Sequence, residues 1–451
     1  MELRRFLSLA EQRGWPLHIP TPVSPRYEMA RLLYALDERL TLFDQVEGWA
    51  GSVAAGLFAR REYVAMALGV PEEGLLPTLV RALNSPVAPQ VVERAPCQEV
   101  VTTDVDLSCL PILTHIPGDG GPYITSGVAI INDAQGRRNA AYHRLMLTPD
   151  RGKCNTFTAR LVEGRDTHTA WLQAGGPLPM AVCIGAPLSA QLAAAMSPAP
   201  GVDELSIANA LAPTPTVRAI GLDLEIPAEC EIVLEGYLSQ ELGPEGPFLD
   251  LTRTRDFVRQ QPFFVVERIT HRSQPIYQAL LPGGREHRLL MGMPREPTIY
   301  AAVSRVCTCR NVHVTPGGGN WLHAVVQIDK RGPEDGRAAI QAAFEGHTSL
   351  KHVVIVDADV DPYDSEAVEW AIATRFQADR DLVVLPDQPS SSLDPSARHV
   401  PGAKARTTKL GLDATIHWDT PAGPARPQDW QVLDYEPIDP TPYLRDPEAS
   451  A

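Results

Sequence analysis

The sequence predicts a mixed α/β (α+β) fold of several domains, and three observations support this prediction. The chain has 451 residues, more than one ordinary domain contains. Short β-like runs separated by turn residues fill the region from about Cys97 to Ala279. After about residue 300, helical and strand-like segments alternate as they do in α/β domains. The apolar fraction of 44% is enough for a sizeable buried core.

Charge and cysteine content narrow the class of protein. The net charge of -15 argues against a nucleic-acid partner, because phosphate contacts need a basic surface. Residues 1–16 have the pattern of an amphipathic helix without the apolar core of a signal peptide, and no stretch has the length of a membrane span. The seven cysteines are scattered and form no CxxC pair, which is typical of reduced thiols. We therefore expect a cytoplasmic protein with no membrane span.

Residues 1–95 form the first expected unit, in which short helices alternate with strand-like pieces. Apolar residues at helical spacing predict a helix over 27–40. In the second unit, residues 96–285, strands are predicted over 124–132, 138–147, 181–185, 232–237 and 263–269, and helices over 189–196 and 203–211. This pattern indicates an irregular sheet or a barrel rather than regularly alternating βα units.

Residues 286–310 are predicted to form a helix that links two domains, although Pro294 and Pro297 fall inside it. The next unit, 311–419, is predicted to contain strands over 321–328, 352–357 and 382–385 and helices over 336–344 and 365–376, the latter capped by Ser365. The tail, 420–451, is rich in proline and acid. Two interpretations of it stay open: an arm that packs on a neighbouring subunit, or partial disorder.

An acidic segment runs from Glu241 to Asp250 and is broken by Gly246-Pro247. Positions five apart on a straight strand face opposite sides, but the break allows Glu245 and Asp250 to point into one pocket. Two carboxylates that share a site separate their pKa values, so one can stay protonated as a general acid. The alternative is a solvated acidic loop, which spacing alone favours.

A second stretch with chemical potential runs from Asn139 to Arg144. On a strand, Asn139 and His143 share one face, while Tyr142 and Arg144 share the other. A buried arginine needs an acidic partner or a phosphate. A surface strand whose arginine makes an ordinary salt bridge fits equally well, and a lone histidine such as His143 is more often structural.

Five motifs in series resemble those of the UbiD-type decarboxylases. They are Gly120-Gly-Pro-Tyr-Ile-Thr-Ser-Gly127, Asn139-x-x-x-x-Arg144, Glu245-Gly-Pro-Phe-x-Asp250, Lys351-His-Val-Val-Ile-Val-Asp-Ala-Asp-Val-Asp-Pro362 and Thr408-Lys-Leu-Gly-Leu-Asp-Ala-Thr415. The resemblance implies a split-barrel-like flavin-binding domain, a linking helix and a C-terminal α/β domain that assembles into a homodimer or a larger homo-oligomer.

The resemblance also implies a reaction. Family members use prenylated FMN, supplied by a flavin prenyltransferase, to accept the electrons left when CO2 departs from a carboxylic acid. On this basis Asp250 is expected to be the proton donor, in an ion-paired network with Glu245 and Arg144.

The phosphate of the flavin needs cations, and the family uses Mn2+ or Mg2+ with K+ nearby; oxygen ligands suit such ions. The resemblance implies Asn139 and Glu204 as metal ligands and Lys351 as a contact to the phosphate. Many members have a histidine ligand near the position of Arg160, and His168 is the candidate here if a short insertion intervenes. The residues expected at the flavin also include Tyr142, His143, Arg144, Arg160, Leu161 and Arg165.

The substrate stays open at this stage, because aromatic, heteroaromatic and α,β-unsaturated acids all fit a pocket with Leu249 and Leu251 beside Asp250. The run from Leu178 to Gly185 is similar to the archaeal branch that decarboxylates an anhydromevalonate phosphate. The alternative functions are a catalytically silent flavin- or metal-binding protein and an assembly subunit of a multi-component (de)carboxylase.

Overall fold

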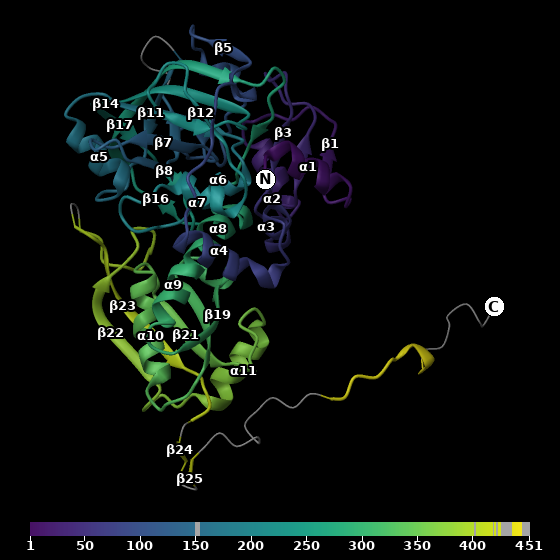
Figure 1. The fold of residues 1–451 in the computed structure, drawn as a ribbon, viewed down its shortest axis with the longest axis vertical. Helices are drawn as coiled ribbons and strands as arrows, with labels where there is room; N and C mark the ends of the chain where they lie inside the picture. The colour runs from purple at the N-terminus through teal and green to yellow at the C-terminus, as the bar shows by residue number, and fades with distance from the viewer. Residues whose placement is uncertain (149–153, 401–402, 418, 421–422, 425–434, 444–451) are drawn as a thin grey trace.

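The computed structural model describes residues 1–148, 154–400, 403–417, 419–420, 423–424 and 435–443. The chain forms two bodies, a larger one that contains the N-terminus and a smaller α/β one (Figure 1). Helices α4, α8 and α9 lie where the two bodies meet (Figure 1). These helices span Leu75–Asn84, Arg285–Gly292 and Glu296–Val303.

The N-terminal segment packs helices against a four-stranded sheet of order β1-β2-β3-β18, whose last strand comes from much later in the chain. Its other elements are α1 (Leu3–Glu11), α2 (Glu28–Ala35), α3 (Arg61–Leu68), β1 (Leu17–Ile19), β2 (Thr41–Phe43), β3 (Val53–Ala55) and β18 (Tyr277–Gln278). The helix predicted over 27–40 ends at Ala35, because Asp37 and Glu38 adopt left-handed backbone angles that no helix continues through.

A curled half-barrel sheet forms the centre of the larger body, in the order β6-β9-β10-β17-β14-β11-β7-β8, with β5 paired to β17. The strands are β5 (Val100–Thr102), β6 (Tyr123–Ile124), β7 (Val128–Asn132), β8 (Arg138–Tyr142), β9 (Leu145–Leu147), β10 (Thr156–Ala159), β11 (Leu178–Ile184), β14 (Ile232–Glu245) and β17 (Arg259–His271). The strand predicted over 138–147 is interrupted at His143 and Arg144, so Arg144 stands outside the ladder.

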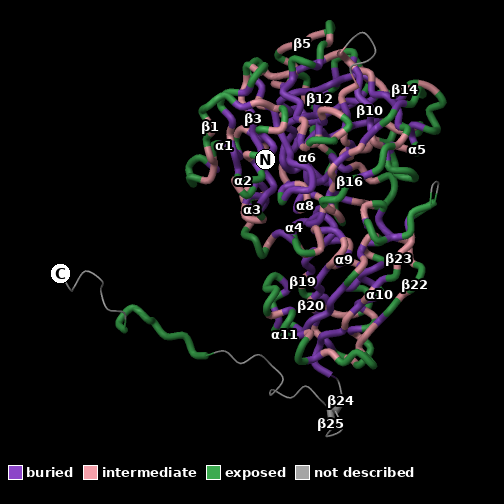
Figure 2. The backbone as a smooth tube through the Cα atoms, turned by 180° about the vertical axis from the view of Figure 1, so that it is seen from behind, coloured by how far each residue is buried: buried purple, intermediate pink, exposed green. Residues whose placement is uncertain are grey.

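Alternating apolar residues give this sheet two buried faces. Val182 packs into one hydrophobic cluster and Cys183 into the other. The cluster that includes Cys183 also receives α1, α3, α4, α6 (Leu188–Ala194) and α7 (Glu204–Leu211). Buried backbone is accordingly continuous through the middle of the larger body (Figure 2). Around the sheet lie α5 (Asp166–Ala174), β4 (Val91–Val92), β12 (Thr216–Arg218), β13 (Glu225–Pro227), β15 (Phe248–Leu249) and β16 (Arg255–Asp256).

The segment 286–310, predicted as one linking helix, is broken. Helix α8 ends at Gly292, a 3-10 turn η4 spans Met293–Arg295, and α9 follows at once. Proline lacks the backbone N–H that a continuous helix would use, and Pro294 lies in this turn. The first strand of the smaller body, β19 (Thr308–Val314), begins before residue 310.

The smaller body is a five-stranded sheet of order β19-β20-β21-β23-β22. Its elements are β20 (His323–Asp329), β21 (His352–Asp357), β22 (Leu382–Pro389), β23 (Arg406–Asp413), α10 (Asp335–Gly346) and α11 (Ser365–Arg375). Strands β20, β21 and β23 run parallel. The predicted cap of α11 was off by one residue: Asp364, not Ser365, caps the helix, and its carboxylate accepts bonds from the amides of Glu366 and Ala367.

Most of the predicted tail, 420–451, lies outside the described residues. The described parts are the short pair β24 (Asp419–Thr420) and β25 (Gly423–Pro424) and a stretch, 435–443, that runs away from the body and holds the turn η7 (Thr441–Tyr443) (Figure 1). All seven cysteines are free thiols. Within the described part of the chain, no helix has the length and apolar character needed to cross a bilayer.

Candidate active site

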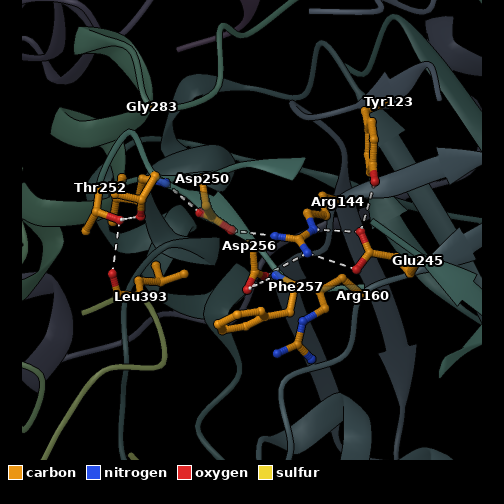
Figure 3. Close-up of polar contacts among 12 residues, drawn as sticks. Tyr123, Arg144, Arg160, Glu245, Asp250, Thr252, Asp256, Phe257, Gly283 and Leu393 are labelled. Carbon is orange, nitrogen blue, oxygen red and sulfur yellow. Dashed lines mark hydrogen bonds and ion pairs between the residues drawn. The ribbon is translucent and has the colours of Figure 1, made fainter. Parts of the chain in front are cut away.

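The side chain of Arg144 contacts three carboxylates (Figure 3). Arg144 donates two bonds of 2.8 Å to the two oxygens of Glu245. It also contacts Asp250 at 2.5 Å and Asp256 at 2.8 Å. The guanidinium lies 4.6 Å from the ring centroid of Phe248. The expected network of Arg144, Glu245 and Asp250 is therefore present as a contact set, and it contains a further acid.

The backbone turn after β14 explains how Glu245 and Asp250 converge. Gly246 has φ +99°, and a Cβ there would stand 2.9 Å from the carbonyl oxygen of Phe257, so only glycine fits. Gly120 packs against the same turn, and its amide donates to the carbonyl of Pro247 at 2.8 Å. The turn thus ends the long strand and redirects the chain toward the arginine.

Charges of both signs meet in the cluster. Burial lowers the pKa of Arg144, but Glu245, Asp250 and Asp256 raise it above its ordinary value, so the guanidinium stays charged. Burial raises the pKa of Asp256, and Arg144 and Arg259 more than offset this, so its pKa lies below the ordinary value. Arg259 also pairs with Asp256 at 2.7 Å, so two guanidiniums face the three carboxylates.

Asp250 is the most accessible acid of the cluster. Its side chain is 15% exposed, against 0% for Glu245 and 5% for Asp256. Tyr123 closes the opposite side, with its hydroxyl 3.3 Å from Glu245. Asp250 is thus the member of the cluster placed to exchange a proton with a bound molecule.

Arg160 lies beside this network without a carboxylate of its own (Figure 3). Its guanidinium donates to the carbonyl oxygen of Leu161, and no ion pair to it occurs among the described residues. Burial, with Arg259 and Arg144 nearby, lowers the pKa of Arg160. The amide of Leu161 donates to Gln261 at 2.6 Å. An uncompensated cation at this place suits an anionic ligand.

A second group of polar residues connects β8 to α7. Asn139 Nδ2 donates to Glu204 Oε1 at 3.1 Å, and the amide of Ala140 donates to Glu204 Oε2 at 2.9 Å. Thr167 donates to Asn139 Oδ1 at 3.0 Å and lies 3.0 Å from His143 Nε2. Burial raises the pKa of Glu204 to about 8. A buried carboxylate without a cation and an amide oxygen beside it form a donor set suited to a hard divalent ion.

The remaining predicted residues are placed around these two groups. His168 Nδ1 accepts from the amide of Gly164 at 3.3 Å, and no contact joins His168 to Asn139 or Glu204 among the described residues. In that same part of the chain no group of three or more His, Cys, Asp and Glu forms a metal site. Lys351 contacts Asp394 at 3.0 Å.

Of the two aromatic candidates next to Arg144, His143 is buried and Tyr142 is half-buried. Tyr142 lies 3.4 Å from Gln191 through its hydroxyl, and burial raises its pKa. Burial lowers the pKa of His143 to about 4, so this ring is neutral at physiological pH. Arg165, which precedes α5, is exposed.

Sequence reasoning left two participants out of the site. Asp256 stands six residues beyond Asp250 in the same acidic segment, so its residue type and position were a usable signal. Tyr123 belongs to the glycine-rich motif that precedes β7, but nothing in that motif indicates that the hydroxyl reaches Glu245.

Family models match three consecutive parts of the chain, all described as 3-octaprenyl-4-hydroxybenzoate carboxy-lyase. The N-terminal domain matches residues 7–83, the Rift-related domain 90–285 and the C-terminal domain 288–414. Anhydromevalonate phosphate decarboxylase of Methanosarcina mazei is 41% identical over 424 residues, which make up 92% of this chain and 96% of that protein.

Solved structures show the same architecture. The UbiD-class enzyme HmfF from Pelotomaculum thermopropionicum, in complex with FMN, has a TM-score of 0.89 and 36% identity over 99% of both chains. An evolved dimeric form of HmfF in complex with prFMN has a TM-score of 0.86 and 34% identity over 98% of both chains. The fold, the acid cluster and these relatives define a carboxy-lyase. The chain belongs to the UbiD family, as the motif series predicted.

Proposed function

We propose that this protein is a non-oxidative, reversible decarboxylase that uses prenylated FMN and acts on an α,β-unsaturated carboxylic acid that carries a phosphate ester. The Arg144 cluster, with Asp250 as its accessible acid, is the observation that carries the reaction type. The 41% identity to an anhydromevalonate phosphate decarboxylase supports the substrate class, since that name denotes a phosphorylated acid from which water has been removed.

The cofactor would be held between the two polar groups of the site. When bound, prenylated FMN supplies an electron sink for the carbon that loses CO2. Asn139 and Glu204 fit a Mn2+ or Mg2+ ion beside the flavin phosphate, with K+ as a further ion, and His168 remains the candidate third ligand. The residues proposed to line the cofactor are Asn139, Tyr142, His143, Arg144, Arg160, Leu161, Arg165, His168, Glu204 and Lys351.

The chain's own residues handle charge and protons. Arg144 orients the substrate carboxylate, and Glu245 and Asp256 hold the guanidinium in place. After CO2 has left, Asp250 delivers a proton to the substrate carbon, because it is the cluster's exposed acid. In the reverse direction the same carboxylate takes that proton away.

Two further proposals complete the assignment. The chain works as a homodimer or a larger homo-oligomer, in line with the dimeric form of HmfF. It works in the cytoplasm with a flavin prenyltransferase as its cofactor supplier, and seven free thiols suit that reducing compartment.

The test is to co-express the chain with a flavin prenyltransferase and to measure released cofactor and CO2. Prenylated FMN bound near one per chain, together with CO2 release from anhydromevalonate phosphate, is the expected result. Cofactor binding without CO2 release from any aromatic, heteroaromatic or unsaturated acid would favour the silent or assembly-subunit alternatives. Release from unphosphorylated aromatic acids only would refute the substrate class and keep the reaction.

A further inference from the structure

Three buried basic side chains lie near the place where the two bodies of the molecule meet. They are Arg295, His347 and Lys409, which we call the junction cluster, and the exposed Arg165 acts electrostatically on the first two. Arg295 ends the turn η4 between α8 and α9, and these helices lie between the bodies (Figure 1). His347 follows α10, Lys409 lies on β23, and Arg165 precedes α5. The cluster therefore draws on the segment between the bodies and on the smaller body.

Among the described residues, Arg295 is buried without a charged partner. It is 7% exposed, and no described group accepts a hydrogen bond from its Nε. One terminal nitrogen donates to Ser197, and the guanidinium lies 5.1 Å from the ring centroid of Trp321. Burial and the nearby charge of Arg165 lower the pKa of Arg295 to about 9.

Among the described residues, His347 and Lys409 are also buried without a carboxylate partner. His347 is 7% exposed, its Nε2 has no partner, and its ring packs edge-on against Trp321 at 4.7 Å. Burial and the charges of Arg295, Lys409 and Arg165 lower the pKa of His347. Burial, with Lys404 nearby, lowers the pKa of Lys409 to about 8. Its ammonium donates to the carbonyl of Thr348 at 2.8 Å and lies 5.0 Å from the ring centroid of Phe344.

Other arginines with little exposure, one of them fully buried, each pair with a carboxylate. Arg61 pairs with both oxygens of Glu296 at 2.9 and 3.0 Å, Arg138 meets Asp203 at 2.6 Å, and Arg375 meets Asp359 at 2.7 Å. No carboxylate pairs with Arg165, Arg295 or Lys409 within the part of the chain that the structure describes. Buried charges are costly without a partner. The described part of the protein therefore supplies no anion to the junction cluster, and an anionic group of a ligand would fill that role.

One stretch of chain connects the acid cluster to the junction cluster. Asp250 and Arg144 act electrostatically on His287 in α8, whose Nδ1 accepts from the amide of Gly283 at 3.0 Å. Arg295 follows α8, in the turn η4. A ligand with a charged group at each end would contact both clusters if it lay along this stretch.

We propose that the junction cluster binds the phosphate of the substrate while the acid cluster holds its carboxyl end. A phosphate monoester is close to a dianion at neutral pH, with oxygens that a guanidinium can meet in pairs and an ammonium can meet singly. The Asn139–Glu204 pair, which belongs to a different group of side chains, is assigned to the cofactor phosphate. This inference rests on the proposed function and adds to it the residues that recognise the phosphorylated end.

The experiment compares holoenzyme variants on anhydromevalonate phosphate and on the same acid without phosphate. Arg295→Gln is expected to raise KM for the phosphorylated acid about 10- to 150-fold, with kcat nearly unchanged. Turnover of the unphosphorylated acid and the bound flavin per chain are expected to stay at the wild-type level. Arg295→Lys should restore part of the affinity, and Arg218→Gln, at an exposed pair with Asp223, is the matched control.

A second readout does not depend on turnover. Inorganic phosphate is expected to raise the thermal midpoint of the wild-type holoenzyme and of Arg218→Gln, and to leave Arg295→Gln and His347→Gln unchanged. If Arg295→Gln loses flavin, the cluster holds the cofactor phosphate and the proposal is wrong. Unchanged kinetics and phosphate binding in both variants would equally overturn it. If the wild type binds phosphate through Arg295 but decarboxylates no phosphorylated acid, the anion site stands and the proposed function fails.

Discussion

Arg144 meets each of its three carboxylates in a different way. Glu245 takes a two-bond contact and is fully buried, Asp256 shares its charge with Arg259, and Asp250 makes one contact and reaches solvent. A two-bond contact fixes the orientation of a guanidinium. Asp250 is held by one bond to Arg144 and by the amide of Leu251, which donates to its Oδ1 at 2.6 Å. These contacts support the proposed division, in which Glu245 and Asp256 hold the guanidinium and Asp250 exchanges the proton.

Replacing Asp250 by Asn should remove turnover and spare the fold. The amide keeps the shape of the side chain but cannot deliver a proton, so kcat is expected to fall by about 10²- to 10⁴-fold. Bound flavin and the thermal midpoint should remain close to those of the wild type, because Arg144 retains Glu245 and Asp256. A variant that keeps more than a tenth of the activity would show that another group protonates the product.

Glu204→Gln should remove the metal and, with it, the cofactor. Glu204 is the acidic side chain that contacts Asn139 among the described residues, and an amide in its place binds Mn2+ far more weakly. We expect metal content by elemental analysis to fall well below one per chain, with flavin content falling in parallel. Glu225→Gln, in a partly exposed pair with Arg138, is the control. Full metal content in Glu204→Gln would contradict the assignment.

The sequence indicated part of this site and missed the rest for a physical reason. Gly246-Pro247 allowed Glu245 and Asp250 to converge, but spacing alone favoured a solvated loop, and only the resemblance to a motif series placed both residues in one network. Arg295, His347 and Lys409 come from three separate elements, and only the packing of two bodies brings them together. Local spacing carries no signal for such a set.

At the scale of elements, strand ends were harder to predict than strand positions. Strand β14 was expected to end at residue 237 and runs to Glu245. Gly236 and Pro244 disfavour a strand locally, but pairing with β17 continues past two register shifts. That extension is what carries Glu245 to Arg144, so long-range pairing, which a single sequence does not display, places the residue.

Two loops from different bodies touch beside the acid cluster. Thr252 donates to the carbonyl of Leu393 at 3.0 Å, two residues from Asp250 (Figure 3). Phe257 and His399 pack with ring centroids 6.1 Å apart. The loop over 390–399 is thus fastened to the loop that carries Asp250.

Thr252→Val should weaken the contact between the two loops without changing the acidic side chains. The bond to Leu393 is lost, worth about 0.5–1.5 kcal/mol, together with the contact to Thr254 Oγ1 at 2.8 Å within the same loop. Faster amide exchange is therefore expected over 390–399, with a fall in kcat/KM of about 2- to 10-fold. Thr252→Ser keeps the donor and should behave like the wild type. Unchanged exchange in the valine variant would mean that the loops are held by other contacts.

At the scale of the whole molecule, the joint between the bodies is built from buried acids of the linking segment. Glu296 binds Arg61 and accepts from the amide of Val314 at 3.2 Å. Glu286 accepts from the amides of Gly56 and Phe58 at 2.8 and 3.2 Å. Each acid thus ties the linking segment to the N-terminal segment, and Glu296 adds the smaller body.

The buried Glu286 should make stability depend on pH. Burial raises its pKa from 4.5 to about 8 in the folded protein. Between these values the folded chain keeps a proton that the unfolded chain has released, so stability falls as pH rises, by about 1.4 kcal/mol per pH unit. Above about pH 8 both states are ionised and this slope ends.

The measurement is the denaturation midpoint of wild type and Glu286→Gln from pH 5 to pH 9. The stability of the variant should not show this decrease with pH. The variant should therefore become more stable relative to the wild type as pH rises. Glu73→Gln, at an exposed position, should follow the wild type throughout. Parallel curves for wild type and Glu286→Gln would show that the carboxylate is ionised in the folded protein across this range.

The break of the linking segment at Pro294 has a consequence for how such enzymes diversify. The residues proposed for the reaction, Arg144, Glu245 and Asp250, all lie upstream of the break, on or next to the strands of the larger body. Arg295, His347 and Lys409, the proposed contacts to the phosphate, lie downstream of Pro294. A protein engineer could exchange this downstream part of the chain as one piece. Mutations in this part can change which acid is bound while the residues proposed for the reaction stay the same. Substrate preference can therefore evolve separately from the ability to release CO2.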